Sequence, residues 1–184
     1  MKQFHDLSSP EIASILISGG IGVLKTDTIY GVVAQASRKE AVERIYTLKG
    51  RDDNKSPIVL ISSLEQLFDM PNSQLREILD HVWPDKISVI MPSIKAPDWI
   101  TRGNHSVAYR MPNDAALTAL IEQTGPLIAP SANPQGAEPA TDIQRAGAYF
   151  GDAVDFYVDQ GVVTDNIPSQ LLRMLPDGTM ERLR

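Results

Sequence analysis

Short apolar runs alternate with amphipathic segments along most of the chain. In the amphipathic segments apolar side chains recur every three or four residues, as on one face of a helix, whereas the apolar runs have the length of buried strands. We expect helices within 8–20, 37–50, 72–84, 113–125 and 141–150. We expect strands within 21–24, 57–62, 86–91, 106–111, 126–130 and, on both sides of a Pro-Asp-Gly turn, within 169–184.

Proline, glycine and polar caps mark the ends of the predicted helices. Pro10 suits the first turn of the first helix. Ser37 and Glu40 have the spacing of a capping box, and Gly50 is suited to end the helix that they begin. Asn113 can cap the helix that follows it. These signals agree with the apolar periodicity on where the helices lie.

The alternation of helices and strands predicts an α/β fold in which helices pack on a sheet. The strands within 86–91 and 106–111 are joined by a longer link that contains prolines, so we expect antiparallel pairs and a mixed sheet. No repeat, low-complexity tract or linker interrupts the pattern. We therefore expect residues 1–184 to form one domain. Folds of this class bind their ligands at the loops that follow the strands.

The composition of the chain argues against several classes of protein. Hydrophobic residues make up 42% of the chain and charged residues 22%, which is ordinary for a globular protein. No apolar run reaches the length of a membrane span, the first residues lack the apolar core of a secretory signal, and cysteine is absent. The sequence predicts a cytoplasmic protein with no membrane partner, disulfide framework or thiolate site.

Charge and histidine content argue against two further classes. A formal net charge of -6 does not suit a protein whose main task is general nucleic-acid binding, which needs a basic field. The three histidines, His5, His81 and His105, are scattered, and there is no cysteine to join them. A zinc site is not expected, and we predict no metal ligands among the protein side chains.

Four polar clusters interrupt the apolar pattern at the ends of predicted elements. Taken one at a time, each has an ordinary structural interpretation: a turn at a strand end, a cation at a helix C-terminus, a surface arginine or a satisfied tight loop. For the first cluster, a capped turn and a wall that faces a ligand are equally supported. The clusters are the run at 25–28, the cations Lys49, Arg51 and Lys55, the single Arg110, and Ser131 with Asn133.

Together the clusters favour the binding of an anion. Lys-x-Arg at 49–51 places two cations close together on a turn, which suits a phosphate or a carboxylate. Ser-x-Asn at 131–133 can add neutral hydrogen bonds around the same ligand. The chain has neither a Gly-rich Walker loop nor a GxGxxG segment, so the standard phosphate-loop and dinucleotide sites are not predicted.

The order of these motifs resembles the YrdC-type threonylcarbamoyl-AMP synthases over nearly the whole chain. The Lys-x-Arg and Ser-x-Asn pairs are that family's most diagnostic features, and both are intact. The chain resembles the short form of the family, which lacks the extra C-terminal domain of longer members. The matching stretches are KTDTIYGVVAQAS, IYTLKGRDDNKSP, HVWPDKISVIMPS, VAYRMPND, PLIAPSANPQGAEPAT and IPSQLL.

The resemblance implies a fold and a reaction. The fold is a single domain with a twisted sheet of parallel and antiparallel strands, flanked by helices, around a concave cationic cavity. The reaction is a nucleotidyl transfer in which L-threonine, bicarbonate or CO₂, and ATP give threonylcarbamoyl-adenylate and pyrophosphate. The product serves tRNA modification to threonylcarbamoyladenosine next to the anticodon. ATP is thus expected as a substrate, with Mg²⁺ held mainly by the phosphates.

The same resemblance implies partners and site residues. tRNA would be a partner indirectly, through the transfer machinery, with a weak direct RNA contact as a further expectation. Lys49 and Arg51 would be catalytic, because they would neutralise phosphate and carbamate charge. ATP would be bound by Lys49, Arg51, Ser106, Ser131, Asn133 and Arg184, threonine by Thr26, Arg110, Ala129 and Ser169, and Thr28, Tyr30 and Lys55 are further pocket candidates.

The sequence departs from the family pattern at several positions, which leaves two alternatives open. One is a non-catalytic module that binds RNA or assists ribosome maturation, and the other is a paralogue with a different acceptor. Lys25 either adds a cation at the pocket edge or points to solvent. The departures are Lys25 and Asp52 in place of prolines, Ser88 and Gln170 in place of threonines, Gln160 in place of a glycine, and Leu60 where some members have a histidine that contacts threonine.

Overall fold

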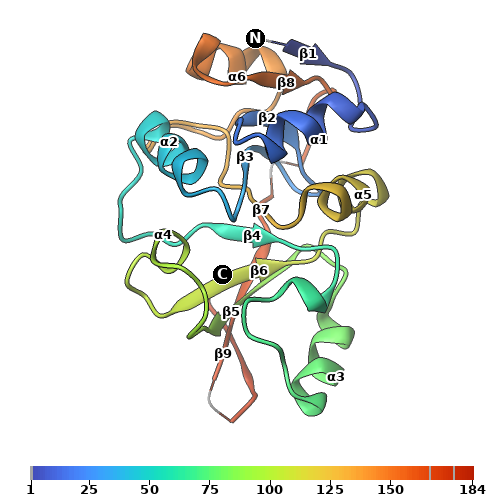
Figure 1. Cartoon of the computed structure of the whole chain (residues 1–184), viewed down its shortest axis with the longest axis vertical. Coiled ribbons are helices and arrows are strands. Elements are labelled where there is room, and N and C mark those ends of the chain that lie inside the picture. The colour runs from blue at the N-terminus through green and yellow to red at the C-terminus, as the bar shows by residue number, and fades with distance from the viewer. Residues whose placement is uncertain (1, 166, 176) are drawn as a thin grey trace.

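The computed structural model describes residues 2–165, 167–175 and 177–184. In this part of the chain ten strands form one sheet in the order β1-β8-β2-β3-β7-β4-β6-β5-β9-β10 (Figure 1). The strands are β1 (Lys2–Phe4), β2 (Gly22–Lys25), β3 (Tyr30–Gln35), β4 (Ile58–Leu60), β5 (Ile87–Pro92), β6 (Ser106–Arg110), β7 (Leu127–Ile128), β8 (Phe156–Val158), β9 (Gln170–Met174) and β10 (Met180–Arg182).

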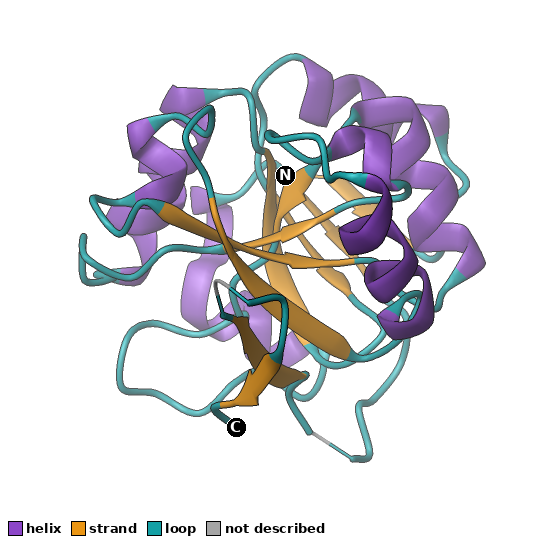
Figure 2. Cartoon of the chain, turned by 90° about the horizontal axis from the view of Figure 1, so that it is seen from below, coloured by secondary structure: helices purple, strands orange, loops and turns teal. Residues whose placement is uncertain are grey.

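Helices lie on both sides of the strands (Figure 2). None of the helices in the described part of the chain has both the length and the apolar character that a membrane span requires. The α-helices are α1 (Pro10–Ile17), α2 (Lys39–Lys49), α3 (Ser73–Val82), α4 (Asp98–Thr101), α5 (Ala115–Thr124) and α6 (Ile143–Phe150), and two 3-10 turns are η1 (Leu64–Gln66) and η2 (Gly151–Ala153).

The sheet is mixed, as the sequence predicts. β4 runs parallel to β6, and β5 runs parallel to β9, whereas β5 and β6 form the expected antiparallel pair. β9 and β10 pair antiparallel at the C-terminal end, which confirms the two strands expected there. Pro176 of the predicted turn between them lies outside the described residues.

The hairpin of β2 and β3 positions the first polar cluster. Its turn spans 26–29 and contains the Thr-Asp-Thr sequence. β3 also pairs with β7, and an isolated antiparallel bridge beyond β7 joins Gly31 to Ser131. The approach is close, because a Cβ on Gly31 would lie 3.3 Å from the carbonyl oxygen of Pro130. The first and fourth polar clusters are thus brought together through backbone pairing.

Two apolar clusters fill the spaces between the sheet and its helices. Val32 and Val33 of β3 are both fully buried but belong to different clusters, because successive side chains of a strand point to opposite faces. α1 and α5 cover the smaller cluster, which includes Leu60, while α2, α3 and α6 contribute to the larger one. Central strands are therefore apolar on both faces, and the polar side chains of the site gather where strands end.

Two of the predicted helix caps are wrong. Arg38 occupies the N-cap of α2 with no capping bond from a side chain, so Ser37 and Glu40 form no capping box. The cap of α5 is Asp114 rather than Asn113, since the Asp114 carboxylate accepts a hydrogen bond from the amide of Leu117. In both helices the true N-cap lies one residue beyond the predicted cap.

Two other predicted helix ends are confirmed. Gly50 ends α2 in the left-handed conformation, with φ 56°, and Pro10 opens α1.

Replacing Gly22 with alanine is expected to lower the free energy of unfolding by about 2 kcal/mol. The added Cβ would lie 2.3 Å from the ring of Phe156, which is fully buried. Gly147→Ala is the matched control, because Gly147 lies in α6 with open space around the Cβ position, so stability should be unchanged or rise by about 0.5–1 kcal/mol. Urea unfolding measures both variants, and wild-type stability in Gly22→Ala would contradict this packing.

Candidate active site

Two connected compartments form a cavity on the sheet. The large compartment has a volume of about 670 Å³ and the small compartment about 280 Å³. Arg51, Ile58 and Arg184 line both, so the two compartments meet at these side chains. The arrangement gives one cavity with two unequal ends and a cationic junction.

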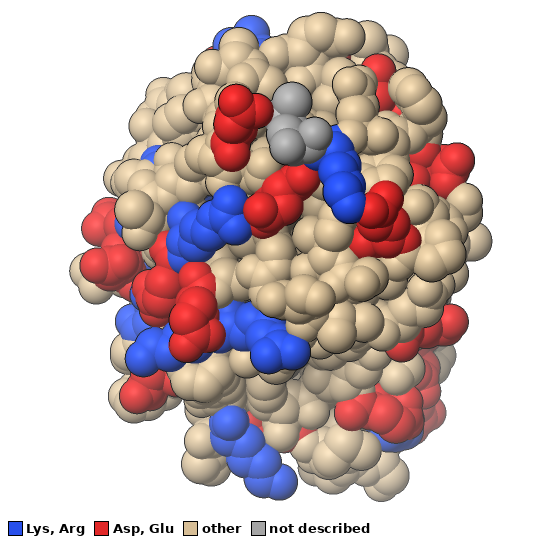
Figure 3. Space-filling model, turned by 45° about the horizontal axis from the view of Figure 1, so that its top comes forward, with Lys and Arg blue, Asp and Glu red and all other residues tan. Residues whose placement is uncertain are grey.

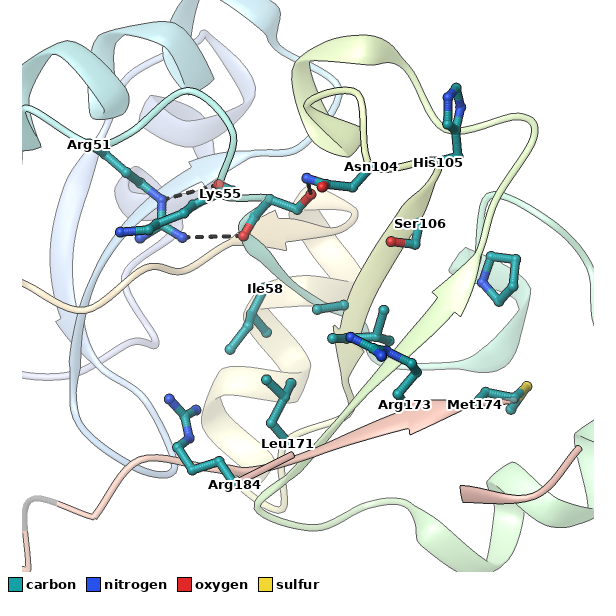
Figure 4. Close-up of a pocket in the computed structure, with 14 residues that line it drawn as sticks. Arg51, Lys55, Ile58, Asn104, His105, Ser106, Leu171, Arg173, Met174 and Arg184 are labelled. Atoms are coloured by element: carbon teal, nitrogen blue, oxygen red, sulfur yellow. Dashed lines mark hydrogen bonds between the residues drawn. The ribbon is translucent and has the colours of Figure 1, made fainter. Parts of the chain in front are cut away.

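The large compartment combines an apolar floor with basic side chains. Figure 4 shows Arg51, Arg173 and Arg184 around the apolar side chains of Ile58 and Leu171. Lys55 also lines this end. A flat apolar group with attached negative charge would match such a lining, because the floor can bury the group while the cations meet the charge.

The cavity differs in charge from the outer surface. On the face shown in Figure 3, Lys and Arg side chains are interspersed with Asp and Glu. Within the described part of the chain, no Asp or Glu lines either compartment. The acidic balance of the whole chain therefore coexists with a cationic cavity, which favours an anionic ligand.

Most of the predicted site residues gather in this cavity. Lys49, Asn133 and Tyr30 are absent from its lining and lie behind its wall. The small compartment is lined by Thr26, Thr28, Arg110, Ala129, Ser131 and Ser169, the large one by Lys55 and Ser106, and both by Arg51 and Arg184.

Lys49 joins two of the polar clusters from inside the protein. Its side chain is buried, and the Nζ group donates hydrogen bonds to the backbone carbonyls of Ser131 and Asn133. Burial, and to a smaller extent the charge of Arg51, lower the pKa of Lys49 to about 7. Lys49 thus fastens the end of α2 to the loop that carries Ser-x-Asn.

Asn133 and Tyr30 also shape the backbone of the wall. The side-chain amide of Asn133 donates to the carbonyls of Pro134 and Ala137, at 2.9 and 2.7 Å. The hydroxyl of Tyr30 donates to the carbonyl of Gly161 at 2.8 Å. These contacts hold two loops beside the small compartment.

A buried ion pair underlies the small compartment. Arg110 Nη2 lies 3.0 Å from Asp27 Oδ1, and the two side chains are 4% and 2% exposed. Arg110 Nη2 also donates to Thr26 Oγ1 at 3.4 Å. Burial raises the pKa of the Asp27 carboxyl and lowers the pKa of Arg110, against their mutual attraction. The result is a guanidinium held in one place at the wall of the compartment.

Thr26 closes a turn and also lines the cavity. Its hydroxyl donates to the carbonyl of Ile29 at 2.8 Å and lies 3.0 Å from the hydroxyl of Thr28, so it closes the turn between β2 and β3. The same residue lines the small compartment. The turn geometry is therefore what presents these hydroxyls to the cavity.

Three of the departures from the family pattern have structural partners. The amide of Lys25 donates to the side-chain oxygen of Gln160 at 3.0 Å, a bond that neither a proline nor a glycine at these positions could form. The hydroxyls of Ser88 and Ser169 lie 2.8 Å apart. Lys25 does not line the cavity, and its backbone explains its place better than its charge.

Sequence reasoning missed several residues of the site. Asp27 lies inside the Thr-Asp-Thr motif and pairs with Arg110, which the sequence pattern does not indicate. The signal is that a buried arginine needs an acidic partner. Arg173 and Asn104 line the large compartment. For Arg173 the signal was strand alternation, because Leu171 and Arg173 lie two residues apart on β9 and face the same side.

The family model Sua5_yciO_yrdC, described as "Telomere recombination", matches residues 14–184. The chain belongs to this family. A threonylcarbamoyl-AMP synthase from Marinobacter nauticus is 33% identical over 181 residues, which is 91% of this chain and 94% of the relative. A threonylcarbamoyl-AMP synthase from Pseudomonas aeruginosa is 31% identical over 175 residues, with 92% of this chain and 94% of the relative covered.

Solved structures in the family share the fold. P. abyssi Sua5 complexed with L-threonine has a TM-score of 0.87 and 27% sequence identity, and the match covers 100% of this chain and 56% of that one. E. coli YciO has a TM-score of 0.83 and 20% identity, over 100% of this chain and 93% of that one. These similarities confirm the α/β fold with a mixed sheet.

Lys49 predicts a distinct pH dependence of stability. Its pKa is about 7 in the folded protein and about 10.4 in an unfolded chain, so between these values the unfolded state binds a proton that the folded state lacks. The free energy of unfolding should therefore rise with pH, by about 2 kcal/mol between pH 7 and 9 from this group. Lys49→Met should lose this rise, as measured by urea unfolding across the pH range.

Lys55→Met is the control for this experiment, because the Lys55 side chain is 57% exposed. It should keep the wild-type pH dependence. Parallel curves for the wild type and Lys49→Met would contradict the burial of the Lys49 ammonium group.

Proposed function

We propose that the protein is a threonylcarbamoyl-AMP synthase, which forms threonylcarbamoyl-adenylate and pyrophosphate from L-threonine, bicarbonate or CO₂, and ATP. Relatives with this name match at 31–33% identity over most of the chain. In the structure, the observation that carries the proposal is the meeting of an amino-acid-sized compartment with a larger cationic one at Arg51 and Arg184.

The reaction places negative charge where the two compartments meet. The amine of threonine attacks the carbon of CO₂ and loses a proton, which gives a carbamate. A carbamate oxygen then attacks the α-phosphorus of ATP, the bond from this phosphorus to the bridging oxygen breaks, and pyrophosphate leaves. Fixed cations at this point lower the barrier because they match the charge that accumulates in the transition state.

The side chains of the small compartment suit the amino acid. Arg110 would pair with the threonine carboxylate, and its fixation by Asp27 would spare the entropy of ordering a long side chain on binding. Thr26 and Ser169 would supply neutral hydrogen bonds, and Ala129 would contact threonine at the same wall.

The side chains of the large compartment suit the nucleotide. Arg51 and Arg184, at the junction, would meet the α-phosphate and the carbamate, while Lys55 and Ser106 would bind further along the triphosphate or sugar. Ser131 would complete the junction from the small compartment. Lys49 and Asn133 would act behind the wall, by holding the 131–133 loop in place.

Mg²⁺ would be bound by the phosphates and water rather than by protein ligands. Within the described residues, no group of three His, Cys, Asp or Glu side chains could hold a metal ion. Because the cavity lining in the described residues holds Lys and Arg and no carboxylate, Mg²⁺ would enter bound to ATP. The ion would neutralise part of the phosphate charge. The product would reach tRNA through separate transfer proteins.

Pyrophosphate release tests the proposal. The protein is incubated with ATP and Mg²⁺, and threonine and bicarbonate are each omitted in turn. Release that requires both is the expected result. Release with another amino acid in place of threonine would indicate a different acceptor, and the absence of release under all conditions would contradict an enzymatic function.

Arg51→Ala should reduce kcat/KM by about 100-fold or more, because it removes a cation that would meet charge in the transition state. Arg51→Lys should retain part of the activity, since the charge remains without the planar fork. The control is Arg76→Ala, which removes an arginine of α3 that is paired with Glu65 on the surface. This variant should keep the wild-type kcat/KM. Arg51→Ala that folds normally and keeps more than half of the wild-type kcat/KM would contradict this assignment.

A further inference from the structure

The loop that carries Arg51 and Lys55 is fastened to a distant turn of the chain. We call residues 51–56 the Arg51 loop. Ser56 Oγ donates to the carbonyl of Thr101 at 2.7 Å, and the side-chain amide of Asn104 donates to the carbonyl of Asn54 at 2.8 Å. The end of α4 and the turn after it therefore hold the Arg51 loop through these two hydrogen bonds.

Arg102 is the unusual residue of this turn. It caps α4 in the left-handed conformation, with φ 52°, which is uncommon for a residue other than glycine. Its side chain is 8% exposed, and Nη1 lies 3.2 Å from Glu43 Oε2. The backbone thus takes a strained conformation that directs a charged side chain into the protein.

Tyr46 connects Arg102 with the Arg51 loop. The Arg102 guanidinium carbon lies 3.7 Å from the centre of the Tyr46 ring, and that of Arg51 lies 5.6 Å from it. The Tyr46 hydroxyl donates to the carbonyl of Lys55. Arg51 itself donates from Nε to the same carbonyl at 3.3 Å and from Nη2 to that of Ser56 at 3.2 Å. One aromatic ring therefore contacts Arg102, Arg51 and the backbone of Lys55.

The buried position of Arg102 lowers the free energy of unfolding. Its Nε and Nη2 atoms are buried and have no hydrogen-bond partner among the residues that the structure describes. Leaving such donors unpaired costs stability, and apolar side chains of similar volume often replace buried charges without loss. The compensation on the ring face depends on the planar guanidinium, which a lysine cannot reproduce. A role in positioning residues of the cavity would explain why an arginine occupies this site despite the loss of stability.

We propose that Arg102 is a positioning residue for nucleotide binding, which acts through the Tyr46 ring to hold Arg51 and Lys55 at the wall of the large compartment. The inference deepens the proposed function and rests on it for the identity of the nucleotide. Arg102 does not line either compartment, so it acts without touching the ligand. The small compartment shares only Arg51 with this assembly, and its Arg110 is fixed separately by Asp27.

Separate affinities for the two substrates test the inference. Calorimetry with the chain of 184 residues measures the Kd of ATP with Mg²⁺ in the absence of threonine, and the Kd of L-threonine in the absence of ATP. Arg102→Lys should weaken ATP binding about tenfold and change threonine binding less than twofold, where tenfold corresponds to about 1.4 kcal/mol. Unchanged ATP affinity with lowered stability, or equal weakening of both ligands, would overturn the proposal.

Arg44→Lys is the matched control, because Arg44 lies on α2 like Tyr46 but pairs with Asp155 at 2.7 Å. It should leave both affinities unchanged. Urea unfolding of each variant establishes that ligand binding is measured on folded protein. Tyr46→Phe offers a milder change than Arg102→Lys, since it keeps the ring and removes the hydroxyl that donates to the carbonyl of Lys55. It should weaken ATP binding less than Arg102→Lys does.

A double-mutant cycle separates positioning from a general effect on stability. If Arg102 acts through the ring, Arg102→Lys should have little further effect on ATP affinity once Tyr46→Leu has been made. Additive losses would overturn the proposal. The test is independent of turnover: a wild type that binds ATP but releases no pyrophosphate would contradict the proposed reaction, while the affinities would still decide the role of Arg102.

Discussion

Hydrogen bonds from the buried amino group of Lys49 fix the shape of the cavity wall. This group donates to two carbonyls of the 131–133 loop, and the carbonyl of Lys49 accepts from the amide of Gln135 at 2.7 Å. A buried cation needs such partners, so the end of α2 and this loop are fixed together. Arg51 lies two residues after Lys49, Ser131 accepts one of these hydrogen bonds, and both residues line the small compartment.

In each of the Lys-x-Arg and Ser-x-Asn pairs, one residue stabilises the wall and the other lines the cavity. In Lys-x-Arg, Lys49 is buried in the wall and Arg51 lines the cavity, whereas in Ser-x-Asn Ser131 lines the cavity and Asn133 holds the loop. The same division recurs in Thr-Asp-Thr, where Asp27 fixes Arg110 from behind while the threonines line the cavity. Residues behind the wall therefore hold in place the side chains that line the cavity.

The fold class could be predicted because helix periodicity is a local property of the sequence. The gathering of most candidate site residues in one cavity agrees with the family resemblance from which they were chosen. β3 was not predicted as a strand, because it begins just after the polar run at 25–28 and contains Gly31 and Ala34, residue types that are depleted in strands. The division of roles between Lys49 and Arg51 could not be predicted either, because it depends on which side of α2 meets the distant 131–133 loop. Arg102 gave no signal at all, since its contact with Tyr46 joins residues that are far apart in the chain.

The most direct test of this account is a crystal structure of the protein with L-threonine and a non-hydrolysable ATP analogue. We expect the guanidinium of Arg51 to contact the phosphates, while Nζ of Lys49 stays within hydrogen-bond distance of the Ser131 and Asn133 carbonyls. A structure in which Lys49 leaves these carbonyls and binds a phosphate oxygen would contradict it.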